Sequence, residues 1–539
     1  MTPQIDLIKE KSLKSQKARK NKKCRNETVE ICDKVIKSSE GVSIMRLAIV
    51  GWLILADIAI FVVLFIWLFT IFSWTLIATY LIGIIFAWRV AISDKNSDSK
   101  VSWIMFLLIL APAGIVFYFM AGETTKKRRK GRRLRKIVER TQLLHKADIP
   151  DNLPSRVKQD CNLIQNTSNF PPYFCTTSKY FSTGEDFYED VLTELQRAEK
   201  FVFMDFFIFS EGYLADAIIK ILADKTKTGV EVKIVVDGFG SHDILRRSNI
   251  KKLKRLGIQL VAFESLLQRL NFLMVYRNHR KIIVIDGKVG YAGGANLGDE
   301  YINAEQRFGL WKDAALRIDG QAVKSLTLMF MRMWDFASKE QSEYEKYLSA
   351  SDNIGENDSD GVIVPYGDGV SEKHNIGKSV YCNIINNAKD YIYIMSPYFI
   401  IDNSVIKLLK AKARSGVDVR LLLPGIPDKK LIYKLTYANA EKLLDSGIKV
   451  YIYSPGFLHS KVVLSDDECA VVGSINFDFR SFYQQYENAV YIGGGEVIKD
   501  ISADFRKAFA ESGLLDYIKK RNIFSRTALS FVRLFSPLM

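Results

Sequence analysis

Residues 278–287 read Asn-His-Arg-Lys-Ile-Ile-Val-Ile-Asp-Gly, and residues 459–466 read His-Ser-Lys-Val-Val-Leu-Ser-Asp. Each stretch carries a histidine, a lysine two positions later and an aspartate five positions after the lysine. Residues two apart on a strand share a face, so each histidine and its lysine should point the same way. The aspartate has the opposite parity, reaches a turn and is better placed to brace the motif. The candidate catalytic set is His279, Lys281, Asp286, His459, Lys461 and Asp466.

A loop of small residues follows each motif. Residues 293–296 read Gly-Gly-Ala-Asn and residues 473–476 read Gly-Ser-Ile-Asn, and each asparagine lies 17 positions after its histidine. Small residues let backbone and amide donors approach an anion closely. The repeated frame therefore predicts a phosphoryl-transfer site with Asn296, Asn476 and Ser474 as phosphate-binding residues. The chain has 5 histidines, and the other three have no repeat partner.

The region 180–515 alternates between strand and helix patterns, and the order recurs. An apolar stretch at 201–209, a helical pattern near 213–228 and a strand at 229–237 return as 391–398, 403–415 and 416–424, displaced by 187 to 190 residues, and the histidines are displaced by 180. A nearly constant offset indicates duplication with changed loops. The pattern predicts a duplicated α/β fold, two α/β/α halves with helices flanking a sheet, linked by the polar stretch 349–361.

Three apolar runs, near 47–69, 73–92 and 102–120, follow a polar tail. Each approaches the ~20 residues that span a bilayer as a helix, so N-terminal transmembrane helices are expected. Positive charge on both sides of the runs predicts that the tail and the catalytic part are cytoplasmic, which needs an even number of crossings. Either the third run, with Pro112, lies in the interface or re-enters, or 47–92 acts as one kinked segment.

The formal net charge of +16 is concentrated beside the apolar runs. Residues 1–40 contribute +5 and residues 126–136 contribute +9, so the rest of the chain is close to neutral. This distribution argues against a nucleic-acid-binding catalytic surface and favours an anionic membrane as partner. The 6 scattered cysteines indicate neither a disulfide framework nor a zinc site. The C-terminal amphipathic stretch either lies in the membrane interface or packs on the catalytic domain.

The expected organisation has seven parts. They are a basic polar tail (1–44), a transmembrane region (45–122), a basic juxtamembrane linker (123–175), a first half (176–348), a linker (349–361), a second half (362–515) and a C-terminal amphipathic segment (516–539).

The motifs together resemble the phospholipase D superfamily and, within it, the bacterial cardiolipin synthases. The matching text comprises 278–287, 293–301, 396–399, 457–461 and 473–482, and the likeness extends from the segment with Pro112 and Gly114 to 533–537. One departure is Gln484-Gln485, where the synthases usually carry an asparagine.

The resemblance implies a covalent phosphohistidine mechanism without metal or cofactor. His279 would be the nucleophile and His459 the acid and base, although sequence symmetry alone does not fix that order. Both lysines and both loop asparagines would hold the phosphate oxygens. Asp313, as the first-half partner, and Glu487, as the second-half partner, would orient the histidines.

The implied reaction transfers a phosphatidyl group between two phosphatidylglycerol molecules and yields cardiolipin and glycerol. The implied location is the bacterial cell membrane, with several crossings. Alternatives are a phospholipase D hydrolase, a phosphatidyltransferase that uses another alcohol, a membrane-anchored nuclease and a non-enzymatic scaffold. The near-neutral catalytic region argues against the nuclease, and the two intact motifs argue against the scaffold. The oligomeric state stays open.

Overall fold

The computed structural model describes residues 55–67, 73–93, 96–121, 125–141, 147–264, 276–351, 361–369, 374–515 and 523–538. The described residues fall into two compact units, divided near residue 123. The predicted polar tail, most of the linker 349–361 and residues 516–522 lie outside the described residues.

The smaller unit is helical throughout its described part. Residues 55–67 form a helix, followed by α3 (Ser73–Ala91), α4 (Ser97–Ile109) and α5 (Ala111–Ala121). The third apolar run, 102–120, is therefore two helices rather than one. Pro112 explains the break, because proline disfavours a helical residue before it but suits the first turn of a new helix. Among the residues with described placement, no helix is both long enough and apolar enough to cross a membrane.

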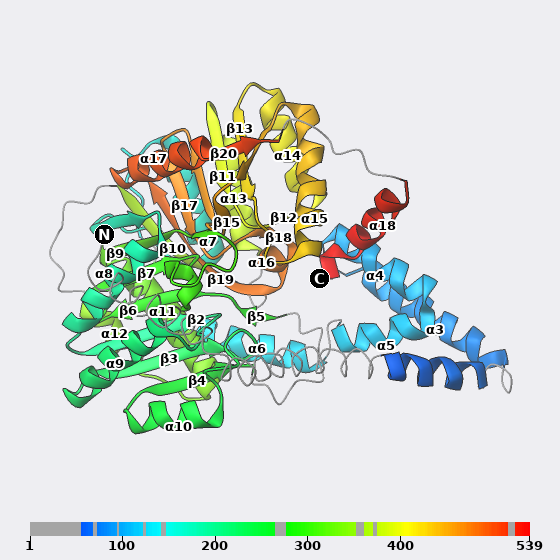
Figure 1. The fold of residues 1–539 in the computed structure, drawn as a ribbon, viewed down its shortest axis with the longest axis horizontal. Coiled ribbons are helices and arrows are strands. Elements are labelled where there is room, and N and C mark those ends of the chain that lie inside the picture. Colours follow the sequence, from blue (N-terminus) through cyan, green and yellow to red (C-terminus); the bar gives the residue numbers. More distant parts are fainter. Residues whose placement is uncertain are drawn as a thin grey trace, which may run out of the picture. The chain divides into compact units, whose positions relative to one another are not determined.

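The larger unit contains two sheets of matching strand order (Figure 1). In the first half, parallel strands β2, β3 and β4 continue into antiparallel β6, β7, β9 and β1. Helices α8 (Gly184–Arg197), α9 (Tyr213–Lys227) and α10 (Arg247–Arg255) belong to this half. The strands are β1 (Thr176–Phe181), β2 (Phe201–Phe206), β3 (Glu231–Asp237), β4 (Gln259–Phe263), β6 (Lys281–Ile285), β7 (Val289–Gly293) and β9 (Ala315–Gly320).

The second half repeats this order and adds an edge strand, β20 (Ser512–Leu514). Its helices are α13 (Ile376–Asn387), α14 (Asn403–Arg414), α15 (Lys430–Ala440) and α17 (Val497–Ala510). Its other strands are β10 (Val362–Asp368), β11 (Tyr391–Met395), β13 (Asp418–Pro424), β14 (Lys449–Tyr453), β16 (Val462–Ser465), β17 (Cys469–Gly473) and β19 (Gln485–Gly493). The duplicated α/β architecture predicted from the repeat is confirmed.

One hydrophobic core serves both halves. Every side chain of β2 is buried, as expected for a strand with neighbours on both edges and cover on both faces. Helix α11 (Val323–Ser338) is buried along almost its whole length, and its Phe330 stacks on Phe203 with ring centroids 4.6 Å apart. Residues of both sheets and of α11 join in a single cluster of buried side chains. The halves are therefore parts of one folding unit.

The stretch 123–175, expected to be a linker, is instead largely helical. It contains α6 (Thr125–Arg140) and α7 (Ser155–Ser168). Val157, Cys161 and Ile164 of α7 are buried in the shared core. Their spacing of four and three residues is the period of an amphipathic helix, so the sequence carried the signal for α7. The prediction of a linker gave too much weight to the basic charge.

The sequence left open whether the C-terminal segment packs on the catalytic domain or lies in the membrane interface. One face of its helix, α18 (Ile523–Leu534), packs on the catalytic unit. Leu529 and Val532 pack against Leu435 and Phe479 of the second half. Phe531 lies on another side of the helix and is 61% exposed. One face of the helix is thus anchored to the catalytic unit, and an aromatic side chain points to the surroundings.

Candidate active site

Each motif histidine is held by backbone pairing with the opposite half. The short strand β5 (Arg277–Asn278) pairs with β19, and the amide N–H of His279 donates to the carbonyl of Tyr486 at 2.8 Å. Likewise β15 (Gly456–Leu458) pairs with β8 (Leu310–Lys312), and the amide N–H of His459 donates to the carbonyl of Lys312 at 2.7 Å. Both histidines are buried. This pairing brings the two motifs into one site.

The carboxylates that contact the histidines are exchanged between the halves. His279 Nδ1 lies 2.9 Å from Glu487 of the second half, and His459 Nδ1 lies 2.5 Å from Asp313 of the first half. Asp313 and Glu487 were expected as the partners of their own halves, and that pairing is wrong. The reason is that β8 and β19, which carry or lead into the carboxylates, are the strands that pair across the halves. The contacts to these carboxylates use Nδ1, and among the described residues no hydrogen bond engages either Nε2 atom.

The pair of His279 and Glu487 is buried deeply enough to favour neutral forms. Burial lowers the pKa of His279 well below that of a free imidazole, and the charges of Lys281 and Lys461 lower it further. Burial raises the pKa of Glu487 to about 8, against the opposing effects of Lys281 and Ser474. His279 is thus kept as an unprotonated imidazole, the form that can attack phosphorus.

His459 has a different electrostatic environment. Burial and the charge of Lys461 lower its pKa to about 4, but the negative charge and hydrogen bond of Asp313 act in the opposite direction. Burial opposes the ionisation of Asp313, yet His459 and Lys461 outweigh it, so the pKa of Asp313 is lowered. An ionised carboxylate therefore stabilises the imidazolium form at His459 and not at His279.

The two motif lysines share the faces of their histidines, as the spacing predicts. Lys281 Nζ donates to the carbonyl of His279 at 2.6 Å, and Lys461 Nζ donates to the carbonyl of His459. Burial lowers the pKa of Lys281 to about 7 and that of Lys461 to about 8, although Glu487 and Asp313 counteract it. Two buried ammonium groups close to two imidazoles form a site for a phosphate anion.

The motif aspartates lie at the far ends of their strands. Asp286 accepts hydrogen bonds from the backbone N–H groups of residues 199, 200 and 201, where β2 begins. Asp466 accepts in the same way from residues 389, 390 and 391, where β11 begins, and also pairs with Arg156. Both aspartates brace the fold and do not contact the histidines, as their parity in the sequence suggested. Their inclusion in the candidate catalytic set is therefore corrected to a bracing role.

The residues expected to bind phosphate through their side chains divide into two groups. Asn296 is already engaged, because it donates to Tyr301 and accepts from the amide of Ile208. Ser474 donates to Glu487, so it holds the carboxylate in place rather than facing the phosphate. Asn476 has a buried amide oxygen with no hydrogen-bond partner among the described residues. Its side chain is the one that is prepared to meet a ligand.

Aromatic rings surround the histidines unequally, and these rings were not among the predicted site residues. The ring of Phe207 lies 5.0 Å from that of His279. His459 has three aromatic neighbours, since Trp311, Tyr301 and Phe457 lie at 5.1, 5.7 and 5.8 Å. Phe457 lies two positions before His459 on an extended segment. The sequence alone therefore predicts that the two side chains are on the same face. These rings give His459 a largely apolar surrounding.

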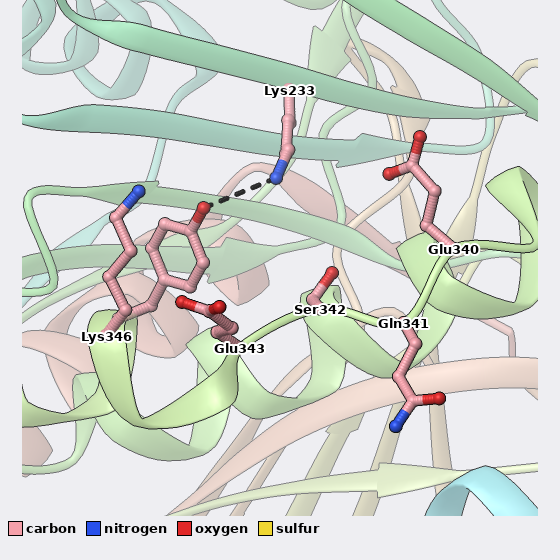
Figure 2. A pocket seen from close by; sticks show the side chains of 7 residues that line it. Lys233, Glu340, Gln341, Ser342, Glu343 and Lys346 are labelled. Carbon is pink, nitrogen blue, oxygen red and sulfur yellow. Dashed lines mark hydrogen bonds between the residues drawn. The ribbon is translucent and has the colours of Figure 1, made fainter.

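A surface hollow of about 340 Å³ lies elsewhere, beside α12 (Tyr344–Leu348), as Figure 2 shows. Its lining includes Glu340, Glu343 and Lys233, and it contains no histidine. Lys233 forms an ion pair with Glu231 at 2.8 Å and contacts the hydroxyl of Tyr347 at 3.4 Å. Lys346 also pairs with Glu231, and Glu340 accepts a hydrogen bond from Trp334, so several charged groups of this hollow are engaged by neighbouring residues.

Comparison with known proteins agrees with this geometry. A family model described as cardiolipin synthase, PLD-like domain, matches residues 191–334 and 381–509. A second, described as phospholipase D-nuclease N-terminal, matches residues 81–123.

The curated relatives cover most of the chain. Cardiolipin synthase 1 of Staphylococcus aureus is 34% identical over 87% of this chain and 98% of that protein. The cardiolipin synthase of Alkalihalophilus pseudofirmus is 32% identical over 87% of this chain and 95% of that protein. An uncharacterised protein of Streptococcus mutans is 39% identical over 70% of this chain and 81% of that protein.

Among solved structures, a phosphatidylserine synthase of Haemophilus influenzae shares the fold. It superposes with a TM-score of 0.54 at 12% identity and covers 71% of this chain and 100% of that chain. The chain therefore belongs to the family of phospholipase D-like cardiolipin synthases.

Proposed function

We propose that the protein is a cardiolipin synthase that joins two phosphatidylglycerol molecules and releases glycerol. The observation that carries the proposal is the pair of buried histidines, each with a carboxylate at Nδ1 from the opposite half and a buried lysine on its own face. This arrangement suits a two-step transfer in which one histidine carries the group and the other moves protons.

In the first step, His279 Nε2 attacks the phosphorus of one phosphatidylglycerol. The new P–N bond forms as the P–O bond to the head-group glycerol breaks, and His459 gives its proton to the departing glycerol oxygen. In the second step, His459 takes the proton from a glycerol hydroxyl of the second phosphatidylglycerol. That oxygen attacks the phosphorus, the P–N bond breaks, and cardiolipin leaves with His279 restored.

The electrostatics support this order of roles. Glu487, with its raised pKa, supports a neutral nucleophile at His279. Asp313, with its lowered pKa, supports a histidine that gains and returns a proton at His459. The pKa of about 4 leaves His459 largely neutral in the free enzyme, and the negative charge of a bound phosphate favours its protonated form. Lys281 and Lys461 neutralise the phosphate oxygens while charge shifts between the entering and leaving atoms.

Contact with the membrane is part of the proposal. The smaller unit exposes many large apolar side chains, among them Ile77, Leu81, Ile85 and Trp88 of α3. The surfaces of soluble proteins rarely have so many exposed apolar side chains together. Lipid chains are the occupant that fits them. The crossings and the cytoplasmic placement of the catalytic unit remain expectations from the distribution of charge.

Helix α6 supports docking of the catalytic unit on an anionic surface. Leu134 and Ile137 are buried in the shared core, whereas Arg132, Arg135 and Lys136 are exposed. Basic residues near an anionic surface contribute about 1 kcal/mol each. Replacing these three exposed residues by glutamine should weaken sedimentation with phosphatidylglycerol vesicles. The matched control neutralises Lys251, Lys252 and Lys254 of α10, which removes the same charge elsewhere.

The test of the proposed reaction is purified full-length protein with phosphatidylglycerol in liposomes, followed by lipid analysis and glycerol release. Cardiolipin and glycerol should appear in equal amounts. Phosphatidic acid as the main product would instead identify a hydrolase. His279→Ala and His459→Ala should each abolish turnover, and full activity in either variant would refute the two-histidine mechanism.

A further inference from the structure

The two halves of the active site differ in charge at two equivalent positions. Two residues before the motif histidine, the first half has Arg277 and the second half has Phe457. Four residues after the loop asparagine, the second half has Arg480 and the first half has Glu300. Arg277 and Arg480 come from different halves, yet the pairing of β5 with β19 places both on the His279 side of the site.

Arg277 lies beside the nucleophilic histidine. It is two residues before His279 along an extended segment, so the two side chains share a face. Its guanidinium lies 4.8 Å from the ring centroid of Phe239 and forms an ion pair with Asp237 at 3.6 Å, a distance longer than a hydrogen bond. Asp237 is itself engaged by the backbone N–H groups of Phe239, Gly240 and Asn278. Within the part of the chain that the structure describes, the guanidinium donates no hydrogen bond.

Arg480 belongs to α16 (Phe479–Tyr483) and lies five residues before Gln485, the backbone partner of Arg277. Its Nε is buried without a hydrogen-bond partner, and the described residues offer its guanidinium no ion pair within 4.0 Å. Burial lowers its pKa; Asp478 opposes this effect and the charge of Arg277 reinforces it. Arg480 is also close enough to His279 to lower the pKa of that imidazole.

Two neighbouring guanidinium groups that donate no hydrogen bond to the described residues exceed what the reacting phosphate requires. Lys281 and Lys461 already supply two cations for that phosphate. The paired N–H groups of a guanidinium can donate two hydrogen bonds to two oxygens of one phosphate. A buried N–H group without an acceptor reduces the stability of the protein. A second phosphodiester would accept hydrogen bonds from both groups, from Arg277 in addition to its ion pair with Asp237. The His459 side, lined by aromatic rings and with Glu300 in place of arginine, offers no comparable anion site.

We propose that Arg277 and Arg480 form a second anion-binding subsite, which holds the phosphodiester of the acceptor lipid while its glycerol hydroxyl is transferred onto the phosphatidyl group. This inference rests on the proposed function and deepens it, because it explains the choice of acceptor. Water and free glycerol lack a phosphate, so they gain nothing from the subsite. Phosphatidylglycerol carries its own phosphate a few bonds from the attacking hydroxyl and is therefore favoured.

The experiment measures two reactions of one phosphohistidine in the same liposomes. Cardiolipin formation uses an acceptor with a phosphate, whereas exchange of labelled free glycerol into phosphatidylglycerol uses an acceptor without one. In Arg277→Gln and Arg480→Gln, the ratio of cardiolipin formed to glycerol exchanged should fall at least about tenfold, which corresponds to about 1.4 kcal/mol. Arg480→Lys keeps the charge without the planar fork and should fall between the wild type and Arg480→Gln. Arg255→Gln, an exposed arginine of α10, is the matched control and should keep the wild-type ratio.

Three outcomes would overturn the subsite. An unchanged ratio in both variants means that the arginines serve both reactions equally or neither. A ratio that falls equally in the Arg255 control means that surface charge governs the effect. A loss of vesicle sedimentation that accounts for the lost cardiolipin means that the arginines dock non-reacting anionic lipid. Failure of the proposed function is distinct from all three, since the wild type itself would then make no cardiolipin.

Discussion

At the scale of single residues, the two carboxylates of the active site differ in charge although their geometries are alike. Asp313 has a lowered pKa and is ionised at neutral pH, whereas burial raises the pKa of Glu487 to about 8. The difference follows from their surroundings rather than from the amino acids, because both side chains are buried and both contact a histidine Nδ1. The duplicated site is thus chemically asymmetric.

This asymmetry predicts unequal effects of two isosteric variants. Asp313→Asn removes a negative charge that stabilises the imidazolium of His459, so kcat should fall at least about 100-fold. Glu487→Gln replaces a largely neutral acid by a neutral amide, so the loss should stay within about tenfold. Initial rates of cardiolipin formation at pH 7 test the comparison. An equal or larger loss in Glu487→Gln would show that Glu487 acts as an anion.

The lowered pKa values of the two motif lysines predict how enzyme activity declines on the alkaline side of its pH profile. Lys281 has a lowered pKa of about 7 and Lys461 of about 8, so their charges are lost as pH rises through these values. The kcat/KM of the wild type, which reports the free enzyme, should therefore decline above about pH 7. In Lys281→Arg the guanidinium stays charged, and the decline should move to about pH 8. Lys288→Arg, on an exposed lysine, should leave the decline unchanged.

At this scale the spacing in the sequence predicted where the candidate catalytic side chains lie on their strands. The two-residue interval put Lys281 and Lys461 on the faces of their histidines, and the parity of Asp286 and Asp466 kept them away from the chemistry. The role of Ser474 was misread, because no local pattern shows that its hydroxyl faces Glu487. A side chain on a loop takes its partner from tertiary packing.

At the scale of elements, the motif aspartates join neighbouring strands. Each accepts three backbone N–H groups at the start of β2 or β11, and those groups would otherwise be unpaired. The pKa of Asp466 is lowered, because its backbone donors and Arg156 outweigh burial. A lowered pKa means that the stabilisation is fully present above the ordinary value of 3.8 and is lost as pH falls further.

Asp286→Asn and Asp466→Asn should destabilise the fold by about 1–3 kcal/mol each, since an amide has one acceptor oxygen where the carboxylate uses two. Thermal unfolding in detergent at pH 7 should show a midpoint several degrees lower. Residual folded enzyme should keep its kcat near the wild-type value. Asp224→Asn, an exposed aspartate paired with Lys227, is the control. An unchanged midpoint in both motif variants would contradict the bracing role.

Helices and strands with a clear hydrophobic periodicity were predicted well. Segments whose structure was inferred from their charge or composition were not. The alternation of strands and helices in 180–515 gave both sheets, because hydrophobic periodicity reports burial. The basic charge of 123–175 concealed α7, and the continuous apolar character of 102–120 concealed the break between α4 and α5. The composition of a segment indicates whether it favours an aqueous or an apolar environment. Capping residues and prolines determine where a helix begins and ends.

At the scale of the whole molecule, the two halves are joined more strongly by their core than by the chain between them. Strands pair across the halves at β5–β19 and β8–β15, and one cluster of buried side chains includes residues of both sheets. Removing either half would expose α11 and would separate each histidine from its carboxylate. The catalytic unit should therefore behave as a single cooperative unit.

A protease site inserted within 352–360 tests this expectation. After cleavage, the two fragments should co-purify in detergent and keep at least about half of the uncut activity, since the cut leaves the shared core intact. A cleavage site inserted between α8 and β2, inside the first half, should abolish activity and serves as the contrast. Separation of the fragments after cleavage of 352–360 would show that the linker holds the halves together.

The sequence by itself determined the duplication, the residue types of the site and the apolar character of the N-terminal unit. These features follow from spacing and composition, which are local. The tertiary structure alone decided which carboxylate serves which histidine and why the halves are unequal. Glu487 meets His279 and Asp313 meets His459 because strands from opposite halves pair at the active site. These two contacts join residues that are 208 and 146 positions apart in the chain, so they depend on how the two sheets pack. The periodicity within a single strand does not predict such contacts.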